Sequence, residues 1–163
     1  MKANEKLLVR FLEGADKHFV IPVYQRNYDW KEKHCKQLFD DLIEITECDF
    51  RTHFLGSVVS IYSDDGEGQE YLIIDGQQRV TTISLLLLAI HNYIIKEAFE
   101  TSVNPEKIKD EYLVNKYSQG SKKIRLKPVK NDNIAFIKLF ENQELDLESN
   151  VTKNYLYFYN RIT

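Results

Sequence analysis

The segment from Arg79 to Phe99 constrains the fold more than any other part of the sequence. Its centre, SLLLLAI at residues 84–90, is apolar on nearly every side of a helix. The segment is too long for an ordinary strand, and a helix that is apolar all round has to be covered by other elements. In a chain of 163 residues, which is the size of one domain, we therefore expect a central buried helix.

Two runs typical of strands precede this helix. FLGSVVSIY at 54–62 and YLII at 71–74 are rich in β-branched and aromatic residues. The polar, glycine-bearing SDDGEGQE between them predicts a hairpin loop that joins two antiparallel strands. An Asp-Gly pair most often forms a hairpin turn, but the residues after Asp75-Gly76 are helical in pattern. DGQQR at 75–79 is therefore predicted at a strand-to-helix junction.

Further elements are predicted on both sides of this core. Pro22 makes residues 19–24 an extended segment, either an edge strand or a rigid loop. Apolar residues at helical spacing follow Asp29, and helical signals recur after Pro105 and near Asn131 or Asp132. The predicted elements are a helix over about 30–46, a helix over 105–117, a short strand at 124–126 and a helix that begins near 131.

The last part of the sequence carries a different signal. NYLYFY at 154–159 contains five large aromatic or apolar residues in a row, more than one helix face in a small domain can bury. We expect residues 1–145 to form the domain and residues 146–163 to begin a helical segment that leads to a further C-terminal region. The alternative is that this segment packs onto the domain itself.

The strand-to-helix junction has the chemistry of an anion site. The first backbone N–H groups of a helix are unpaired, and the helix dipole is positive there. Gly76 allows a phosphate to approach the backbone, Arg79 supplies a charged planar fork, and Asp75 can hold a divalent ion or orient a water. Further donors to a phosphate are Gln77, Gln78, Thr81 and Thr82. The alternative is a capped helix whose polar residues are solvated.

A second constellation is IPVYQRNYDW at 21–30. It places Arg26 beside the amide of Gln25 and between aromatic residues, on a segment that Pro22 stiffens. Such a segment can stack a base or ribose and pair a phosphate. The alternative is that its aromatic residues, Tyr28 and Trp30 among them, pack at the start of the following helix.

The charge distribution favours only local contacts with nucleic acid. The net charge is -3, so the molecule as a whole does not attract phosphate backbones. KYSQGSKKIRLKPVK at 116–130 nevertheless contains no acid. Its candidate contacts to nucleic acid are Lys122, Lys123, Arg125 and Lys127. The alternative is a solvated loop with an edge strand that lysines protect from pairing.

Several other classes of protein are disfavoured by the sequence. No G-x-x-x-x-G-K-[ST] motif occurs, which excludes a P-loop mechanism. The histidines and cysteines near residues 34–53 lack the paired spacing of zinc sites. Two cysteines are too few for a disulfide framework and suit a reducing cytoplasm. No secretory signal or membrane span is recognisable, so we expect a soluble, cytoplasmic protein.

Three motifs follow one another in the order and spacing of a known family. IPVYQRNYDW at 21–30, FLGSVVSIY at 54–62 and IIDGQQRVTTISLLLLAI at 73–90 resemble the N-terminal domain of the GmrSD family of type IV, modification-dependent restriction endonucleases. That domain belongs to the wider ParB/sulfiredoxin-like superfamily, in which a G-x-x-R motif at a helix N-terminus binds nucleotide phosphates. Gly76-Gln77-Gln78-Arg79 matches this motif.

The resemblance implies an α+β fold of the ParB/sulfiredoxin-like kind, with a small mixed sheet flanked by helices. It implies binding and hydrolysis of a nucleoside triphosphate with a divalent cation, Mg²⁺, in a pocket between DGQQR and the PxYQRxYxW segment. Catalytic roles fall to Asp75, Gln78 and Arg79, with Asp75 as the metal ligand. The residues expected to bind the nucleotide are Gln25, Arg26, Tyr28, Gly76, Gln77, Gln78, Arg79, Thr81 and Thr82.

In the complete enzymes this activity is coupled to cleavage of foreign, modified DNA, as in prokaryotic defence against phage. The nuclease motif of the family lies in a separate C-terminal domain or subunit, and the four histidines here show no nuclease pattern. Gln77 stands where sulfiredoxins have a nucleophilic cysteine, so peroxiredoxin repair is disfavoured. The alternative function is a non-catalytic module in which a bound nucleotide switches a surface for DNA or a protein partner.

Overall fold

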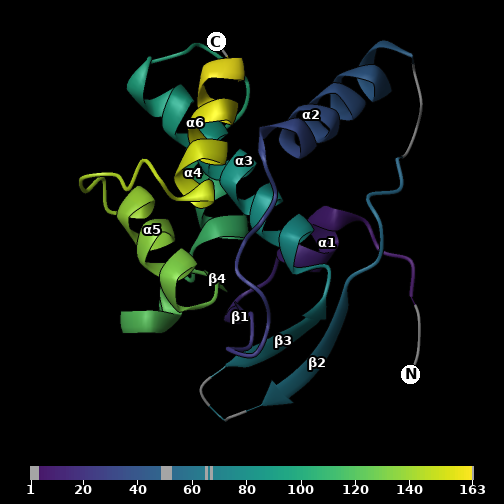
Figure 1. Cartoon of the computed structure of the whole chain (residues 1–163), viewed down its shortest axis with the longest axis vertical. Helices are drawn as coiled ribbons and strands as arrows, with labels where there is room; N and C mark the ends of the chain where they lie inside the picture. Colours follow the sequence, from purple (N-terminus) through teal and green to yellow (C-terminus); the bar gives the residue numbers. More distant parts are fainter. Residues whose placement is uncertain (1–3, 49–52, 65, 67, 163) are drawn as a thin grey trace.

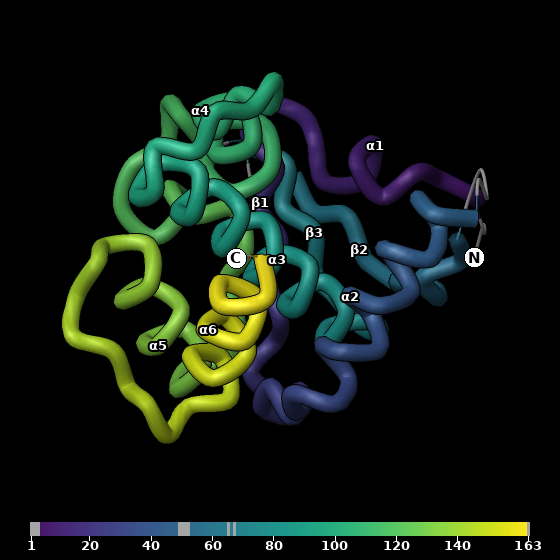
Figure 2. The backbone as a smooth tube through the Cα atoms, turned by 90° about the horizontal axis from the view of Figure 1, so that it is seen from above, coloured from purple at the N-terminus to yellow at the C-terminus, as the bar shows by residue number. Residues whose placement is uncertain are grey.

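The long apolar helix predicted from the sequence is the centre of the molecule. The structure, a computed structural model, describes residues 4–48, 53–64, 66 and 68–162. α3, Gln77–Lys96, begins directly after a strand and lies between α2, Glu32–Glu47, on one side and α5, Lys130–Phe140, on the other (Figures 1 and 2). Twelve of its 20 residues are buried, so helices and sheet do cover it on several sides.

Four strands form one mixed sheet, which confirms the predicted α+β class. The order across the sheet is β2-β3-β1-β4. β2 and β3 pair antiparallel, as the predicted hairpin requires, whereas β1 pairs parallel with both of its neighbours. The strands are β1, Lys17–Val20; β2, Val59–Asp64; β3, Gln69–Asp75; and β4, Leu126–Lys127.

β1 corrects one expectation about the extended segment around Pro22. The sequence left an edge strand or a rigid loop open for residues 19–24, but β1 is an interior strand that ends at Val20. Pro22 lies just beyond it, where no ladder hydrogen bond is needed. The residues after β1 form the rigid loop, which runs as irregular backbone from residue 21 to residue 31.

The remaining elements complete the helical layer above the sheet. The region predicted as one helix over 105–117 is a short helix followed by a π-helical turn, and it ends at Leu113. These elements are α1, Leu8–Leu12; α4, Pro105–Ile108; the π-helical turn Lys109–Leu113; the 3₁₀ turn Gly120–Lys122; and α6, Asn150–Ile162. In the described part of the chain, no helix is long and apolar enough to cross a membrane.

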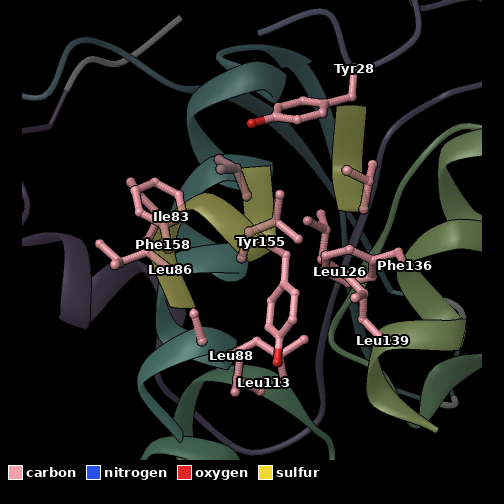
Figure 3. Packing of buried hydrophobic residues seen from close by; sticks show 14 of the residues in the cluster. Tyr28, Ile83, Leu86, Leu88, Leu113, Leu126, Phe136, Leu139, Tyr155 and Phe158 are labelled. Atoms are coloured by element: carbon pink, nitrogen blue, oxygen red, sulfur yellow. The ribbon is translucent and has the colours of Figure 1, made fainter. Parts of the chain in front are cut away.

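α6 is part of the core of the domain. It packs along α3 and also contacts α2 and α5. Figure 3 shows Phe158 of α6 in the same cluster as Ile83 and Leu86 of α3, and Val151 and Phe158 are fully buried. Residues 150–162 thus join the same hydrophobic core as the residues before 145, which is the alternative that the sequence left open.

The domain accommodates the aromatic residues of α6 because they face different neighbouring elements. Phe158 packs against Phe39 of α2 with ring centroids 6.4 Å apart, while Tyr159 lies edge-on to Tyr93 of α3 at 5.7 Å. The hydroxyl of Tyr155 accepts a hydrogen bond from Asn92 Nδ2 of α3 at 2.9 Å. Tyrosine hydroxyls can thus be paired at the border of the core while the rings are covered.

Truncation of Phe158 tests whether α6 belongs to the folding unit. We expect Phe158→Ala to lower the free energy of unfolding by about 3–5 kcal/mol, because a fully buried ring is replaced by a cavity. Tyr117→Ala, at a ring that is 86% exposed, is the matched control and should change stability by less than about 0.5 kcal/mol. Urea unfolding measures both; equal midpoints for the two variants would contradict the packing of α6.

Candidate functional site

DGQQR lies at a strand-to-helix junction, as predicted. β3 ends at Asp75, Gly76 is the N-cap residue, and α3 begins at Gln77. Gly76 has φ +86°, in the left-handed region that favours glycine. A Cβ on Gly76 would lie 2.8 Å from the carbonyl oxygen of Ser57 and 3.1 Å from the Cα of Val58. Glycine is therefore required by the backbone turn and by the chain that crosses it, whether or not a phosphate also approaches.

The side chain of Gln78 joins DGQQR to the QRNYDW segment. Its Oε1 accepts hydrogen bonds from the backbone N–H groups of Asp29 at 2.8 Å and Trp30 at 3.2 Å. Its Nε2 donates to the carbonyl oxygen of Asn27 at 3.2 Å. Gln78 is only 6% exposed, so this amide substitutes for backbone pairing in a loop that has no ladder partners. The two motifs that carry the family resemblance thus form one unit.

Gln25 and Gln77 make parallel connections between the same two segments. Gln25 Nε2 donates to the carbonyl oxygen of Ile74 at 2.9 Å, and Gln77 Nε2 donates to that of Arg26 at 3.3 Å. The Oε1 atom of Gln77 is buried and has no hydrogen-bond partner among the described residues. Gln77 and Gln78 therefore reach from α3 to the loop, and Gln25 reaches from the loop to β3. Their bonds to backbone groups differ from the expectation that the three amides line a phosphate directly.

Tyr28 and Thr82 lie in the interior of the domain, and their expected contact with a nucleotide remains a prediction. Tyr28 belongs to the buried cluster drawn in Figure 3 and is 5% exposed. Its hydroxyl lies 2.6 Å from Thr82 Oγ1. Asn154 of α6 also donates to the Tyr28 hydroxyl, at 2.9 Å. Thr82 Oγ1 donates to the carbonyl oxygen of Gln78 at 2.7 Å, and Thr81 is likewise buried. These groups hold the loop against α3 and α6, and burial raises the pKa of Tyr28 well above its ordinary value.

Four charged side chains remain near the surface of the junction. Asp75 is exposed, and its Oδ1 accepts a hydrogen bond from the Gly76 N–H at 2.8 Å. The guanidinium of Arg79 donates to the carbonyl oxygen of Ser57 at 2.5 Å and lies over Gly56, where a Cβ would be 2.7 Å from Arg79 Nε. Arg26 and Asp29 are exposed and lie 3.4 Å apart as an ion pair. The structure thus brings Asp75 and Arg79, together with the Arg26–Asp29 pair, to the start of α3.

A small pocket separates the loop from the start of α5. Its lining includes Arg26, Gln77 and Asp132, beside the apolar Ile21 and Val129. Its enclosed space is about 10 Å³, room for about one water molecule. This pocket as it stands is too small to hold a nucleotide base.

Three residues of this site were not identified from the sequence. Asp132 accepts a hydrogen bond from the Tyr28 N–H at 2.6 Å, and burial raises the pKa of its carboxyl. Asn150 and Asn154 donate to the carbonyl oxygens of Tyr28 at 3.2 Å and Trp30 at 2.8 Å. Each lies more than 100 positions from its partner. The only available signal was their polarity within amphipathic helices, which indicates neither depth nor partner.

The predicted nucleic-acid contacts do not form one surface. Arg125 is 3% exposed, and its guanidinium donates to the carbonyl oxygens of Leu12, Gly14, Asp110 and Val114 at 2.6–3.3 Å. The guanidinium thus pairs with four backbone carbonyl oxygens in the interior. Contrary to the expectation from the sequence, Arg125 is not placed to contact a phosphate. Lys123 and Lys127 are exposed, and Lys122 is half-buried.

The metal prediction for Asp75 remains a prediction. Within residues 4–48, 53–64, 66 and 68–162, no group of three or more His, Cys, Asp or Glu side chains could hold a metal ion. Among the described residues, Asp75 therefore belongs to no group of three or more side chains that could form a protein-only site. An ion at this position would need oxygen ligands from a phosphate or from water.

Comparison with known families identifies the type of domain. A family model described as the GmrSD restriction endonuclease, N-terminal domain, matches residues 8–162. The match includes the loop, the junction and α6, the elements that the glutamine and asparagine side chains hold together. Among curated proteins, none matches the chain significantly.

Substitution of Gly76 tests the turn at the junction. We expect Gly76→Ala to destabilise the domain by at least about 1–3 kcal/mol, because alanine is strained at positive φ and its Cβ would strike the Ser57 carbonyl. Gly120→Ala is the control for φ alone, since Gly120 has φ +60° with no atom within 4 Å of an added Cβ. Thermal unfolding measures both. Equal losses in the two variants would show that the close approach at Gly76 contributes nothing.

Truncation of Gln78 tests its role as the link between the two motifs. We expect Gln78→Ala to cost about 2–4 kcal/mol, because three hydrogen bonds of about 1 kcal/mol each are lost from a buried site. Amide hydrogen exchange at Asp29 and Trp30 should become faster. Gln37→Ala on the exposed face of α2 is the control. Unchanged exchange at both amides would refute the link.

Proposed function

The chain belongs to the family of N-terminal domains of GmrSD restriction endonucleases, and on that basis we propose that it binds a nucleoside triphosphate at the junction of β3 and α3 and hydrolyses it within a restriction system. The observation that supports this most directly is the joining of the two motifs by three glutamine side chains. They position two acids and two arginines at the start of a 20-residue helix.

The start of α3 offers donors of the kind that phosphates require. Its first intrahelical hydrogen bond runs from Val80 N to Gly76 O at 3.1 Å. The N–H groups of Gln77, Gln78 and Arg79 therefore precede the helical ladder and carry the positive end of the helix dipole. Arg79 and Arg26 add charge at the same end. In this proposal the backbone and Arg79 bind the phosphates, and Arg26 closes the site from the loop.

Asp75 fits a role as the protein ligand of a phosphate-bound Mg²⁺. Its Oδ1 is held by the Gly76 N–H, which orients the carboxylate and leaves Oδ2 for a cation or a water. Mg²⁺ at phosphate sites is commonly held by one or two carboxylates together with substrate oxygens. Bound there, the ion would neutralise charge on the phosphates. A lone carboxylate at an anion site would otherwise repel the ligand.

Gln78 enters this proposal as a positioning residue. Its amide is committed to Asn27, Asp29 and Trp30, so it cannot also touch a phosphate without releasing the loop. The catalytic role that the resemblance gave to Gln78 is therefore proposed to act through the loop that carries Arg26. Gln77 differs, because its Oε1 atom has no partner among the described residues and lines the small pocket.

The second candidate function is a nucleotide-dependent switch without turnover. It is favoured by the finding that, in the described part of the chain, Asp75 belongs to no group of three or more potential metal-ligand residues. In this version a bound nucleotide alters the loop, and the loop alters a surface for DNA or for a nuclease domain or subunit. Lys123 and Lys127 are the exposed members of the predicted contacts to DNA, which we propose is modified phage DNA.

Nucleotide turnover by conservative variants tests the proposal. We expect phosphate release from a nucleoside triphosphate with Mg²⁺, and a fall in kcat/KM of about 100-fold or more for Asp75→Asn and Arg79→Lys. Asp75→Asn removes the negative charge that would hold the ion, and Arg79→Lys removes the planar fork of donors that would pair the phosphate oxygens. Arg79→Lys keeps a cation over Gly56 and avoids a cavity. Glu44→Gln and Arg10→Lys, at exposed positions, are the matched controls.

Calorimetry separates the two candidate functions. Stoichiometric nucleotide binding that Arg79→Lys weakens, with no phosphate release by the wild type, would reject hydrolysis and retain the switch. If turnover occurs at equal rates in Asp75→Asn, Arg79→Lys and the controls, the assigned site is wrong. Absence of both binding and turnover with ATP, GTP, CTP and UTP would reject both functions for this chain.

A further inference from the structure

A second polar pocket lies at the opposite end of the sheet from DGQQR. Its lining includes Asp16, His18, Glu70, Asn115 and Lys122. His18 and Glu70 stand near the starts of β1 and β3, whereas Asp75 ends β3. Since a strand rises about 3.3 Å per residue, the seven residues of β3 place the two sites roughly 20 Å apart. The proposed nucleotide site therefore makes no use of this pocket.

The pocket concentrates buried polar atoms that lack partners. Seven buried side-chain nitrogen or oxygen atoms have no hydrogen-bond partner among the described residues, and three of them belong to His18 and Asn115. They are both ring nitrogens of His18 and Oδ1 of Asn115, whose residues are 5% and 2% exposed. Buried groups are almost always paired, so a local concentration of exceptions indicates an absent ion or water.

The orientation of Asn115 is fixed by its other amide atom. Nδ2 donates to the carbonyl oxygens of Lys17 at 2.8 Å and Lys122 at 3.0 Å. A flipped amide would place an oxygen against both carbonyls, so Oδ1 is the atom left without a partner. Asn115 thus presents an acceptor that no side chain or backbone group of the described residues uses.

His18 and Glu70 complete a set of ligand atoms from neighbouring strands. They are direct partners in the parallel register of β1 and β3. His18 Nδ1 lies 3.8 Å from Glu70 Oε2, too far for a hydrogen bond. Two ligands of one tetrahedral Zn²⁺ lie about 3.3–3.5 Å apart at ordinary bond lengths. A small movement of the half-exposed Glu70 side chain is enough to reach that separation.

The charges of the pocket also suit a cation. Asp16 and Glu70 contribute two negative charges and Lys122 one positive charge, so these lining groups sum to −1. Neutral imidazole is the form in which histidine binds a metal.

We propose that this pocket binds a divalent transition-metal ion of the Zn²⁺ class through His18, Glu70 and Asn115. Imidazole nitrogen with carboxylate and amide oxygen is a donor set that such ions accept, and the enclosed space of about 10 Å³ suits one small occupant. The ion would tie the starts of β1 and β3 to the segment around residue 115. Water completes its coordination, since the described residues provide no three-residue His, Cys, Asp or Glu cluster.

Titration of the chelator-treated protein with ZnCl₂ in a calorimeter, without nucleotide, tests the proposal. We expect one saturable site and a rise in the thermal midpoint with added Zn²⁺. His18→Gln and Glu70→Gln should each weaken binding by at least about tenfold. His53→Gln is the matched control, because His53 also lies near an acid, 3.6 Å from Asp41, but at the surface. Its affinity should equal that of the wild type.

The remaining outcomes each contradict the site or separate it from the nucleotide site. No saturable binding by the wild type would mean that water fills the pocket, and the proposal would be wrong. It would also be wrong if Glu70→Gln, folded by circular dichroism, bound Zn²⁺ as tightly as His53→Gln. Asp75→Asn should bind Zn²⁺ unchanged, so failure of this proposal and failure of the nucleotide proposal are distinguishable.

Discussion

The amide of Gln78 is the contact on which the arrangement of the site depends. One side chain at the start of α3 satisfies three backbone groups of a loop that is almost 50 residues earlier in the chain. Irregular backbone next to a core is stable only when its polar groups are paired. The loop therefore follows α3, and α3 is fixed by burial against α6, α2 and the sheet. Hydrophobic packing fixes the helix, and hydrogen bonds fix the loop to the helix. The charged residues on both segments are therefore held in defined positions relative to one another.

The parts of the fold that follow from local pattern could be predicted from the sequence. α2, α3, α5 and the β2–β3 hairpin were all expected, within a few residues, because each shows its own periodicity or turn signal. The place of β1 inside the sheet could not be predicted, since its partners β3 and β4 lie about 50 and 110 residues away. The packing of α6 onto the domain was only the alternative in the sequence analysis, because the aromatic run was judged from its composition. The run contains more aromatic residues than one fully buried helix face can hold. Two of its tyrosines lie at the border of the core instead, where their hydroxyls pair with Asn92 and Glu97.

The sequence predicted which segments meet at the candidate site better than it predicted what each polar side chain there does. That DGQQR and QRNYDW meet was expected from the resemblance, and the hydrogen bonds between them agree with it. The sequence does not reveal which polar side chains point outward. Gln78, Thr82, Tyr28 and Arg125 have the chemistry of ligand-binding groups, yet each is used to pair buried backbone or side-chain atoms. Buried polar side chains are almost always hydrogen-bonded within the protein, and the sequence does not indicate how deeply a polar side chain is buried.

The parallel pairing of β1 with both neighbours has a consequence for how the chain folds as it is synthesised. β1 is made early, but its partner β4 follows about 100 residues later, and the asparagines of α6 that hold Tyr28 and Trp30 come later still. Ribosomes add about 5–20 residues per second. For several seconds the nascent chain therefore has an unpaired strand and an apolar α3 segment without its covering helix, which are the features that attract chaperones and favour aggregation. The domain can close only when nearly all of its sequence has been made.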